Sequence, residues 1–178
     1  MQDQAKQRSL NEVKVSYDND HGYPIENDFD QIHEKALGAA SLAQVHKARK
    51  KATGEICAVK LQYPELKWQT KIDIFVIRQI SKLANRLCRY YKYTGVDFVK
   101  FMAHFEKSLL QELDFKQEVI NTIRVQDHFS GYDGLYVPKV HILMSTKRSI
   151  VMEYVEGDKI DDLEALDKKY GKATAATD

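Results

Sequence analysis

Hydrophobic residues along the chain follow two different periods, which together predict a sheet interrupted by a long helical section. Five short stretches have the alternation or the β-branched and apolar content of strands. They lie at residues 29–37, 43–49, 55–62, 137–144 and 149–154. Turn-forming residues separate neighbouring stretches. The pattern therefore predicts three strands before the helical section and two after it.

The helical section is expected to contain two long amphipathic stretches. After Pro64, which suits a first helical turn, apolar residues recur at steps of three and four as far as Tyr91. Thr94 and Gly95 break this pattern, and it resumes over residues 98–123. The aromatic stripe of this second stretch is expected to pack in the core.

Both ends of the chain are more polar than its middle. Residues 1–28 are expected to form a polar N-terminal extension, with ordered structure starting near Phe29. Residues 158–178 are expected to hold the start of a further lobe, with a polar helix at 159–170 and a disordered tail of small residues. The functional domain is therefore expected at residues 29–157.

Composition narrows the function classes. The 178 residues suffice for one domain with a real core, and 27 basic against 26 acidic residues leave a net charge of +1. A general nucleic-acid binder would need an excess of Lys and Arg, so the charge balance argues against that class. No stretch approaches the roughly 20 apolar residues of a membrane-spanning helix. The first thirty residues show no targeting segment.

The cysteines and histidines do not have the spacing of a metal site. Cys57 and Cys88 lie far apart and are expected to be reduced thiols. Ligand spacings such as His-Glu-x-x-His do not occur among the six histidines, which are His21, His33, His46, His104, His128 and His141. The sequence therefore predicts no metal site within this chain.

A loop of small residues and a lysine on the following strand have the layout of a phosphate site. The loop lies in the run from Ala36 to His46, where small side chains let backbone N–H groups approach an anion. Lys60 ends the next apolar stretch and can supply a positive charge to the same phosphates. Alone, such a lysine is more often one that extends into solvent from a strand edge. The preceding loop makes the phosphate site the better interpretation.

Three carboxylates lie close together in the second helical stretch, at Glu112, Asp114 and Glu118. Asp114 and Glu118 share a helix face, where like charges repel by roughly a few tenths of a kcal/mol. The cluster is better tolerated if a lysine or a metal ion lies against it. The alternative is an exposed acidic face balanced by Lys107 and Lys116. Spacing alone leaves both interpretations open.

Basic residues also follow one face of the first long helical stretch, at Arg78, Lys82, Arg86 and Arg89. Such a row is compatible with contact to a lipid or anionic membrane surface. A solvated helix face is the simpler interpretation.

Four sequence blocks, found in the same order, resemble the UbiB/ADCK family of atypical kinases. They are ALGAASLAQVHKA at 36–48, AVKLQYP at 58–64, ELDFKQEVIN at 112–121 and VPKVHILMSTKRSIVMEYVEG at 137–157. The resemblance is specific and covers residues 29–162. It implies an α+β fold, namely a protein-kinase-like N-terminal lobe with a five-stranded antiparallel sheet, an enlarged helical insertion and no C-terminal lobe.

The resemblance also implies roles for the residues already singled out. The alanine-rich loop replaces the glycine-rich loop of ordinary kinases, Lys60 contacts the ATP phosphates, and Glu118 is its ion-pair partner. Glu112 and Asp114 correspond to the family's Glu-x-Asp motif. Backbone groups of the hinge at residues 153–155 would bind adenine. The implied nucleotide-binding residues are Gly38, Ala39, Ala40, Ser41, Lys60, Glu153 and Val155.

Family resemblance implies ATP and Mg²⁺ as cofactors, a mitochondrial location, and a link to coenzyme Q and other prenyl lipids. ATPase activity coupled to lipid handling is expected in preference to protein phosphorylation. No Lys-x-Gly-Gln motif precedes the loop, and no His-x-Asp or Asp-Phe-Gly motif follows it. Catalytic residues and most Mg²⁺ ligands are therefore expected in a missing large lobe, which leaves this chain an inactive ATP-binding lobe. The alternative is a non-catalytic module that binds a protein partner or that large lobe.

Overall fold

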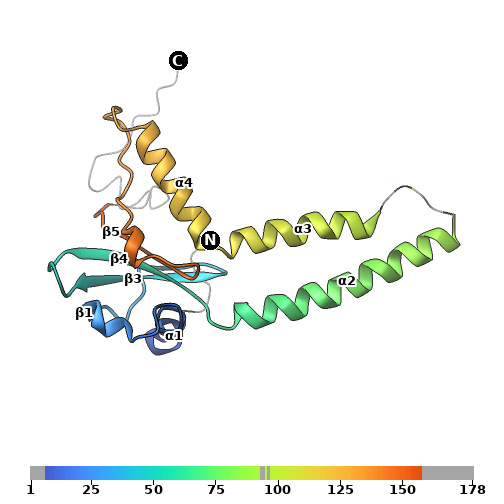
Figure 1. The fold of residues 1–178 in the computed structure, drawn as a ribbon, viewed down its shortest axis with the longest axis horizontal. Coiled ribbons are helices and arrows are strands. Elements are labelled where there is room, and N and C mark those ends of the chain that lie inside the picture. The colour runs from blue at the N-terminus through green and yellow to red at the C-terminus, as the bar shows by residue number, and fades with distance from the viewer. Residues whose placement is uncertain (1–6, 93–94, 96, 158–178) are drawn as a thin grey trace, which may run out of the picture.

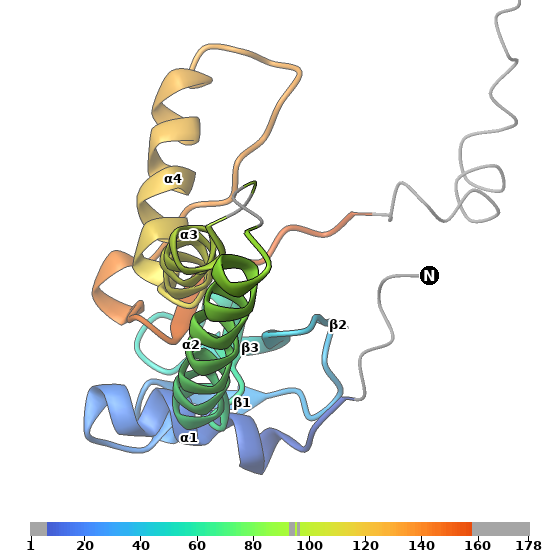
Figure 2. The same cartoon turned by 90° about the vertical axis from the view of Figure 1, so that its right-hand side faces the viewer.

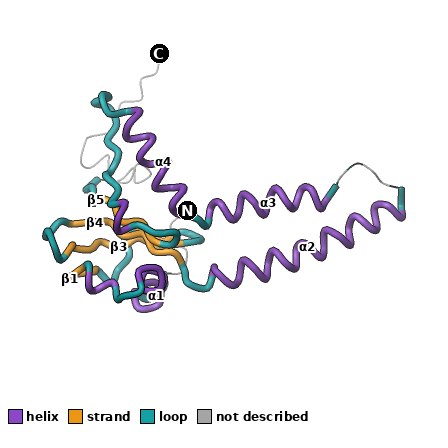
Figure 3. Tube along the Cα trace, viewed as in Figure 1, coloured by secondary structure: helices purple, strands orange, loops and turns teal. Residues whose placement is uncertain are grey.

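A computed structural model describes residues 7–92, 95 and 97–157 of the chain (Figure 1, Figure 3). The helix expected at 159–170 lies outside these residues. In chain order the elements are α1 Leu10–His21, η1 Ile25–Asn27, β1 Phe29–Ile32, β2 Gly38–Ala39, β3 Ala43–Lys50, β4 Ile56–Gln62, α2 Leu66–Tyr90, α3 Phe98–Glu112, α4 Phe115–His128, η2 Ile142–Met144 and β5 Ser149–Glu153.

Five strands form one antiparallel sheet, as expected from the fold class. The strand order is β1-β3-β4-β5, and β2 pairs with the first part of β3 beside β1. The register sets Lys60 of β4 opposite Val45 of β3 and Ile150 of β5. Lys60 therefore lies in the middle of the sheet, where two neighbouring strands hold its backbone in place.

Helices cover both faces of the sheet, with α1 on one side and α4 on the other (Figure 1). Successive strand residues point to opposite faces, so each strand contributes to both layers. The layer under α1 contains Val13, Tyr17, Val59, Leu61 and Val151, and the layer under α4 contains Ala43, Phe115, Val119 and Ile150. Lys60, between Val59 and Leu61 in the chain, faces α4.

Helix α1 differs from the expectation of a polar extension before Phe29. Val13 and Tyr17 are fully buried and pack against the sheet, because their four-residue spacing puts them on one helix face. The helix ends at Gly22, whose φ of 77° is left-handed and whose N–H donates to the Asp18 carbonyl at 2.8 Å. Ordered structure thus begins before residue 29.

The outer strands also differ from the expected ones. Of the strand expected at 29–37 only β1 forms, and the short strand β2 follows just after that range; the strand expected at 137–144 does not form. In the second segment, Val140 makes only an isolated bridge to Met152 of β5. The chain then turns into η2, where Leu143 is 99% exposed. Alternate residues of this segment are therefore not buried against the sheet, as they would be in a strand.

Helices α2 and α3 form an antiparallel hairpin that extends away from the sheet (Figure 1) and is seen almost end-on in Figure 2. Arg78 of α2 donates to Glu106 of α3, with Nε and Oε2 2.8 Å apart. Near the tip, the Asn85 side chain accepts from the Phe98 N–H at 2.9 Å and donates to Asp97 at 2.9 Å. Within the described ranges, no helix combines the length and apolar composition needed to cross a bilayer.

The basic row of α2 is exposed, as a solvated helix face predicts, and two of its members, Arg78 and Lys82, also line the cleft between α2 and α3. One expectation for this hairpin was wrong. The aromatic stripe is only partly in contact with other elements, since Phe101 is 64% exposed and Phe105 is 47% exposed. The physical reason is that α3 packs mainly on one neighbouring helix, which covers a narrow stripe of its surface.

His46 of β3 makes the stability of this fold dependent on pH. The residue is fully buried; its Nδ1–H donates to the His33 carbonyl at 2.7 Å, and its Nε2 accepts from the Gln44 amide at 2.7 Å. Burial lowers the pKa of His46. A protonated ring would also turn a donor toward the Gln44 amide.

Below about pH 6.5 the unfolded chain therefore binds a proton that the native state does not, so stability falls as the pH falls, by up to about 1.4 kcal/mol per pH unit. We expect urea denaturation between about pH 7.5 and pH 5.5 to show this slope, and His46→Asn to flatten it. Part of the slope should remain, because burial also lowers the pKa of His141. An unchanged slope in the variant would contradict this account.

Candidate functional site

A cavity of about 720 Å³ lies between the sheet and α4. The turn between β2 and β3, the centre of β4, the end of α3 and one face of α4 form its walls. Its size is within the range of small-molecule sites. The structure brings six of the residues singled out from the sequence into its lining, namely Ala40, Ser41, Lys60, Glu112, Asp114 and Glu118.

An ion pair between Lys60 and Glu118 lies in the wall of this cavity. The Lys60 Nζ is 2.7 Å from each carboxylate oxygen of Glu118, and it also lies 4.7 Å from the ring centroid of Phe115. Phe115, the first residue of α4, is buried and anchors this end of the helix. Glu118 follows three residues later and thus lies over β4. The Lys60 side chain is 24% exposed, so its ammonium remains accessible from the cavity.

Two residues with small side chains, Ala40 and Ser41, lie in the β2–β3 turn at the cavity. The Ala40 N–H donates to the Ala43 carbonyl at 2.8 Å, which closes a tight turn over Ser41. Gly38 and Ala39 pair with β3 and do not line the cavity. An added Cβ at Gly38 would meet no atom within 4 Å, so the geometry of this loop does not require a glycine there.

The Glu-x-Asp residues lie at the junction between α3 and α4. Glu112 is the last residue of α3, and Asp114 caps α4 by accepting from the Lys116 N–H at 3.1 Å. The Lys147 ammonium lies 3.8 Å from the Asp114 carboxylate. A lysine therefore lies against each of two carboxylates, Lys147 at Asp114 and Lys60 at Glu118. This arrangement agrees with the interpretation that a lysine lies against the carboxylate cluster.

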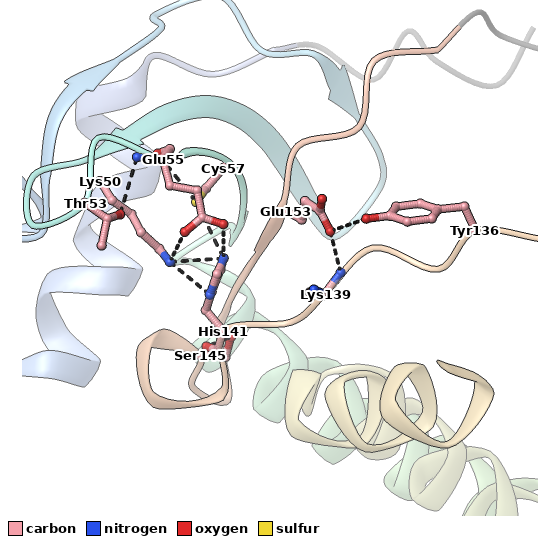
Figure 4. Close-up of polar contacts among 9 residues, drawn as sticks. All are labelled: Lys50, Thr53, Glu55, Cys57, Tyr136, Lys139, His141, Ser145 and Glu153. Atoms are coloured by element: carbon pink, nitrogen blue, oxygen red, sulfur yellow. Dashed lines mark hydrogen bonds and ion pairs between the residues drawn. The ribbon is translucent and has the colours of Figure 1, made fainter. Parts of the chain in front are cut away.

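The hinge residues are not part of this cavity. The Glu153 carboxylate accepts from the Tyr136 hydroxyl at 2.6 Å and from the Lys139 N–H at 3.2 Å (Figure 4). The Tyr136 hydrogen bond is the main reason that the pKa of Glu153 lies below its usual value. Val155 follows β5 and is 46% exposed. The structure thus brings the loop, the lysine and the helix carboxylates together, and leaves Glu153 and Val155 apart from them.

Sequence reasoning missed several residues of α4 that line the cavity, among them Asn121, Thr122 and Val125. They follow Glu118 at steps of three, four and seven, so they share its helix face. Once Glu118 is placed against Lys60, this spacing identifies them. The pairing of Glu118 with Lys60 that the resemblance implies was the signal that could have found this face.

Comparison with protein-family models gives a match that covers nearly the whole chain. Residues 1–176 match the model described as ABC1 atypical kinase-like domain. Among curated proteins, the ABC1 family protein MCP2 homolog of Schizosaccharomyces pombe is 36% identical over 94% of this chain and 29% of its own length. AarF domain-containing protein kinase 1 of Mus musculus is 35% identical over 93% of this chain and 30% of its own length.

A more distant relative and a solved structure are also similar to this chain. The probable protein kinase UbiB of Aliivibrio fischeri is 29% identical over 94% of this chain and 30% of its own length. In the solved complex of Rv3197 with erythromycin from Mycobacterium tuberculosis, the protein has a similar fold, with a TM-score of 0.69 and 22% identity over 90% of this chain and 38% of that one. The chain thus spans about 30% of the length of these curated relatives. The match over residues 1–176 and the identities to relatives show that the chain belongs to the ABC1 atypical kinase-like family, which includes UbiB and the AarF domain-containing kinases.

Proposed function

We propose that the cavity between β4 and α4 binds the phosphates of ATP. The observation that carries this proposal is the Lys60–Glu118 ion pair in the wall of a cavity whose opposite edge is the small-residue turn at Ala40 and Ser41. Glu118 holds the lysine in one place, and the Lys60 ammonium supplies the positive charge that a phosphate needs. The turn lets the phosphates approach without a side-chain obstruction.

Carboxylates at the cavity edge fit the proposed Mg²⁺. Oxygen ligands are what Mg²⁺ prefers, and it binds through one or two carboxylates together with phosphate oxygens and water. Glu112 and Asp114 both line the cavity and offer such oxygens. When bound, the ion would neutralise negative charge on the phosphates. The Asp114 carboxylate already accepts a backbone hydrogen bond as the N-cap of α4. Glu112 is therefore the carboxylate that is more available to bind Mg²⁺.

For the whole protein we propose an atypical kinase or ATPase whose remaining residues lie outside this chain. Its family membership supports a mitochondrial location and ATP use coupled to prenyl-lipid or coenzyme Q metabolism. This chain contains no His-x-Asp or Asp-Phe-Gly motif. We therefore expect the 178-residue polypeptide to bind ATP weakly without turning it over.

A carboxylate introduced at the phosphate edge tests the site. Ala40 is exposed and lines the cavity, so Ala40→Glu is compatible with the fold and puts a negative charge beside the phosphates. Repulsion at this range is expected to weaken ATP binding at least about tenfold, measured by isothermal titration calorimetry. Ala52→Glu, at another exposed position, in the β3–β4 turn, is the matched control and should leave affinity unchanged. Equal affinities in the two variants would contradict the site.

A second candidate function is an interaction module, and the α2–α3 hairpin favours it. One face of α2 carries exposed apolar side chains at steps of three and four, each between 45% and 59% exposed: Ile72, Val76, Ile80, Leu83 and Leu87. A row of this kind marks a surface that another polypeptide or a lipid surface covers. Association through it should persist in Ala40→Glu, which separates this function from nucleotide binding.

A further inference from the structure

Three side chains with metal-binding atoms meet on the side of the sheet away from the ATP cavity. They are Glu55, in the turn before β4, Cys57 of β4, and His141, just before η2 (Figure 4). Their ligand atoms all lie within 4.8 Å of one another. Cys57 packs in the layer under α1, whereas Lys60 faces α4. The cluster is therefore separate from the proposed nucleotide site.

Distances within the cluster match those between the ligands of a tetrahedral zinc ion. The Cys57 Sγ lies 3.7 Å from the His141 Nε2, and that nitrogen lies 3.4 Å from a carboxylate oxygen of Glu55. With Zn–S near 2.3 Å and Zn–N or Zn–O near 2.1 Å, tetrahedral angles separate sulfur from nitrogen by about 3.6 Å and nitrogen from oxygen by about 3.4 Å. Two of the three separations thus match zinc geometry, and the third, between the Cys57 sulfur and the Glu55 carboxylate, is within 4.8 Å.

Backbone hydrogen bonds fix the position of His141. Its N–H donates to the Val151 carbonyl at 2.8 Å, and its own carbonyl accepts from the Ser145 hydroxyl at 2.9 Å. Cys57 is held on the other side by β4, which pairs with both β3 and β5. Two of the three donors are therefore preorganised, which lowers the entropy cost of binding an ion.

Lys50 brings a positive charge to the cluster. Its ammonium lies 2.8 Å from Glu55, and 2.9 and 3.1 Å from the two ring nitrogens of His141. The same ammonium would repel a divalent ion, so Lys50 must move out toward solvent when such an ion binds.

We propose that Glu55, Cys57 and His141 form a site for a divalent transition metal of the zinc type. On binding, the Cys57 S–H bond breaks, its proton passes to solvent, and the thiolate forms a bond to the metal. The fourth ligand is a water molecule, and the displaced Lys50 ammonium becomes solvated. The ion ties the β3–β4 turn to the segment that leads into β5.

Cobalt spectroscopy of the 178-residue chain without nucleotide tests this site. Co²⁺ adopts zinc geometry, so we expect an absorption band from thiolate-to-cobalt charge transfer. Cys57→Ser should abolish the band, and Cys88→Ser, the other cysteine of the chain, should leave it intact. Circular dichroism checks that both variants fold. A cobalt spectrum without a thiolate band, or a band lost in Cys88→Ser, would overturn the proposal.

Removal of the competing cation provides a second, independent test. Lys50→Met should tighten Zn²⁺ binding at least about tenfold, measured by competition with a chelator of known affinity. His141→Asn should weaken binding by a similar factor. An affinity that Lys50→Met leaves unchanged or lowers would overturn the proposal, because the ion would then bind elsewhere. Neither result depends on ATP, so the outcome is separate from that of the proposed function.

Discussion

Replacing Lys60 with Met is expected to remove most of the stabilisation that ATP confers on this chain. Lys60 provides a positive charge in the cavity wall, 2.7 Å from both oxygens of Glu118. Met has similar length and can still pack on Phe115, so the substitution removes the charge with little change in shape. A hydrogen bond to a charged group contributes about 1.5–3 kcal/mol, which corresponds to roughly 10- to 150-fold weaker ATP binding.

Thermal unfolding with and without ATP measures this effect. A ligand present at about 100 times its Kd stabilises the native state by about 2.7 kcal/mol, and by only about 0.4 kcal/mol if the Kd rises 100-fold. The wild-type chain should therefore show an ATP-dependent shift that nearly disappears in Lys60→Met. The melting temperature without ATP shows whether the variant still folds.

Lys100→Met is the matched control for this experiment. Lys100 lies on α3 and its side chain is 87% exposed, so the same substitution there should leave the ATP-dependent shift unchanged. Glu118→Gln should give an intermediate loss, because Lys60 keeps its charge and loses the carboxylate that positions it. Equal shifts in wild type and Lys60→Met would show that nucleotide does not contact this lysine.

Replacing Tyr17 with Ala is expected to destabilise the native state by about 3–5 kcal/mol, the range measured for large buried aromatic residues. The Tyr17 side chain is fully buried, its ring stacks on His21 at 3.8 Å and meets Phe29 edge-on at 6.1 Å. Its hydroxyl also donates to the Asp28 carboxylate at 2.6 Å. The substitution would leave a cavity between α1 and the sheet and an Asp28 oxygen without this partner.

Urea denaturation of two further variants separates the ring from the hydroxyl. Tyr17→Phe keeps the ring and loses the hydrogen bond to a charged carboxylate, so a smaller cost of about 1.5–3 kcal/mol is expected. Tyr23→Ala removes an aromatic side chain that is 38% exposed and should cost clearly less than Tyr17→Ala. Similar losses in Tyr17→Ala and Tyr23→Ala would mean that α1 contributes little to the core.

Central parts of the fold could be predicted because their signals are local. Strands β3 and β4 follow alternating burial, and the turn between them contains Gly54, whose φ of 73° is left-handed. Helix α2 follows from its apolar spacing after Pro64. The break between α3 and α4 was missed, although Asp114 is a good N-cap residue, because the apolar pattern continues across it.

Peripheral parts were decided by tertiary contacts. Helix α1 looks polar in sequence because it buries only one narrow face, with Val13 and Tyr17 as its main apolar contacts. Residues 137–144 have strand-like composition, and the turn into η2 limits their pairing with β5 to an isolated bridge. The hairpin of α2 and α3 leaves much of its apolar surface exposed, which periodicity alone does not reveal.

By itself, the sequence determined the central strands, the long helical section, and the small-residue loop followed by Lys60. These features depend on residues that are close together in the chain, so the local spacing of apolar and polar residues predicts them. The resemblance had already implied Glu118 as the partner of Lys60, and the structure contains that ion pair. Only the tertiary structure decided that the β2–β3 turn, the end of α3 and one face of α4 enclose a single cavity, and that His141 lies beside Cys57, 84 residues away in the chain. Contacts of this kind arise from the packing of whole elements, and spacing along the chain does not encode them.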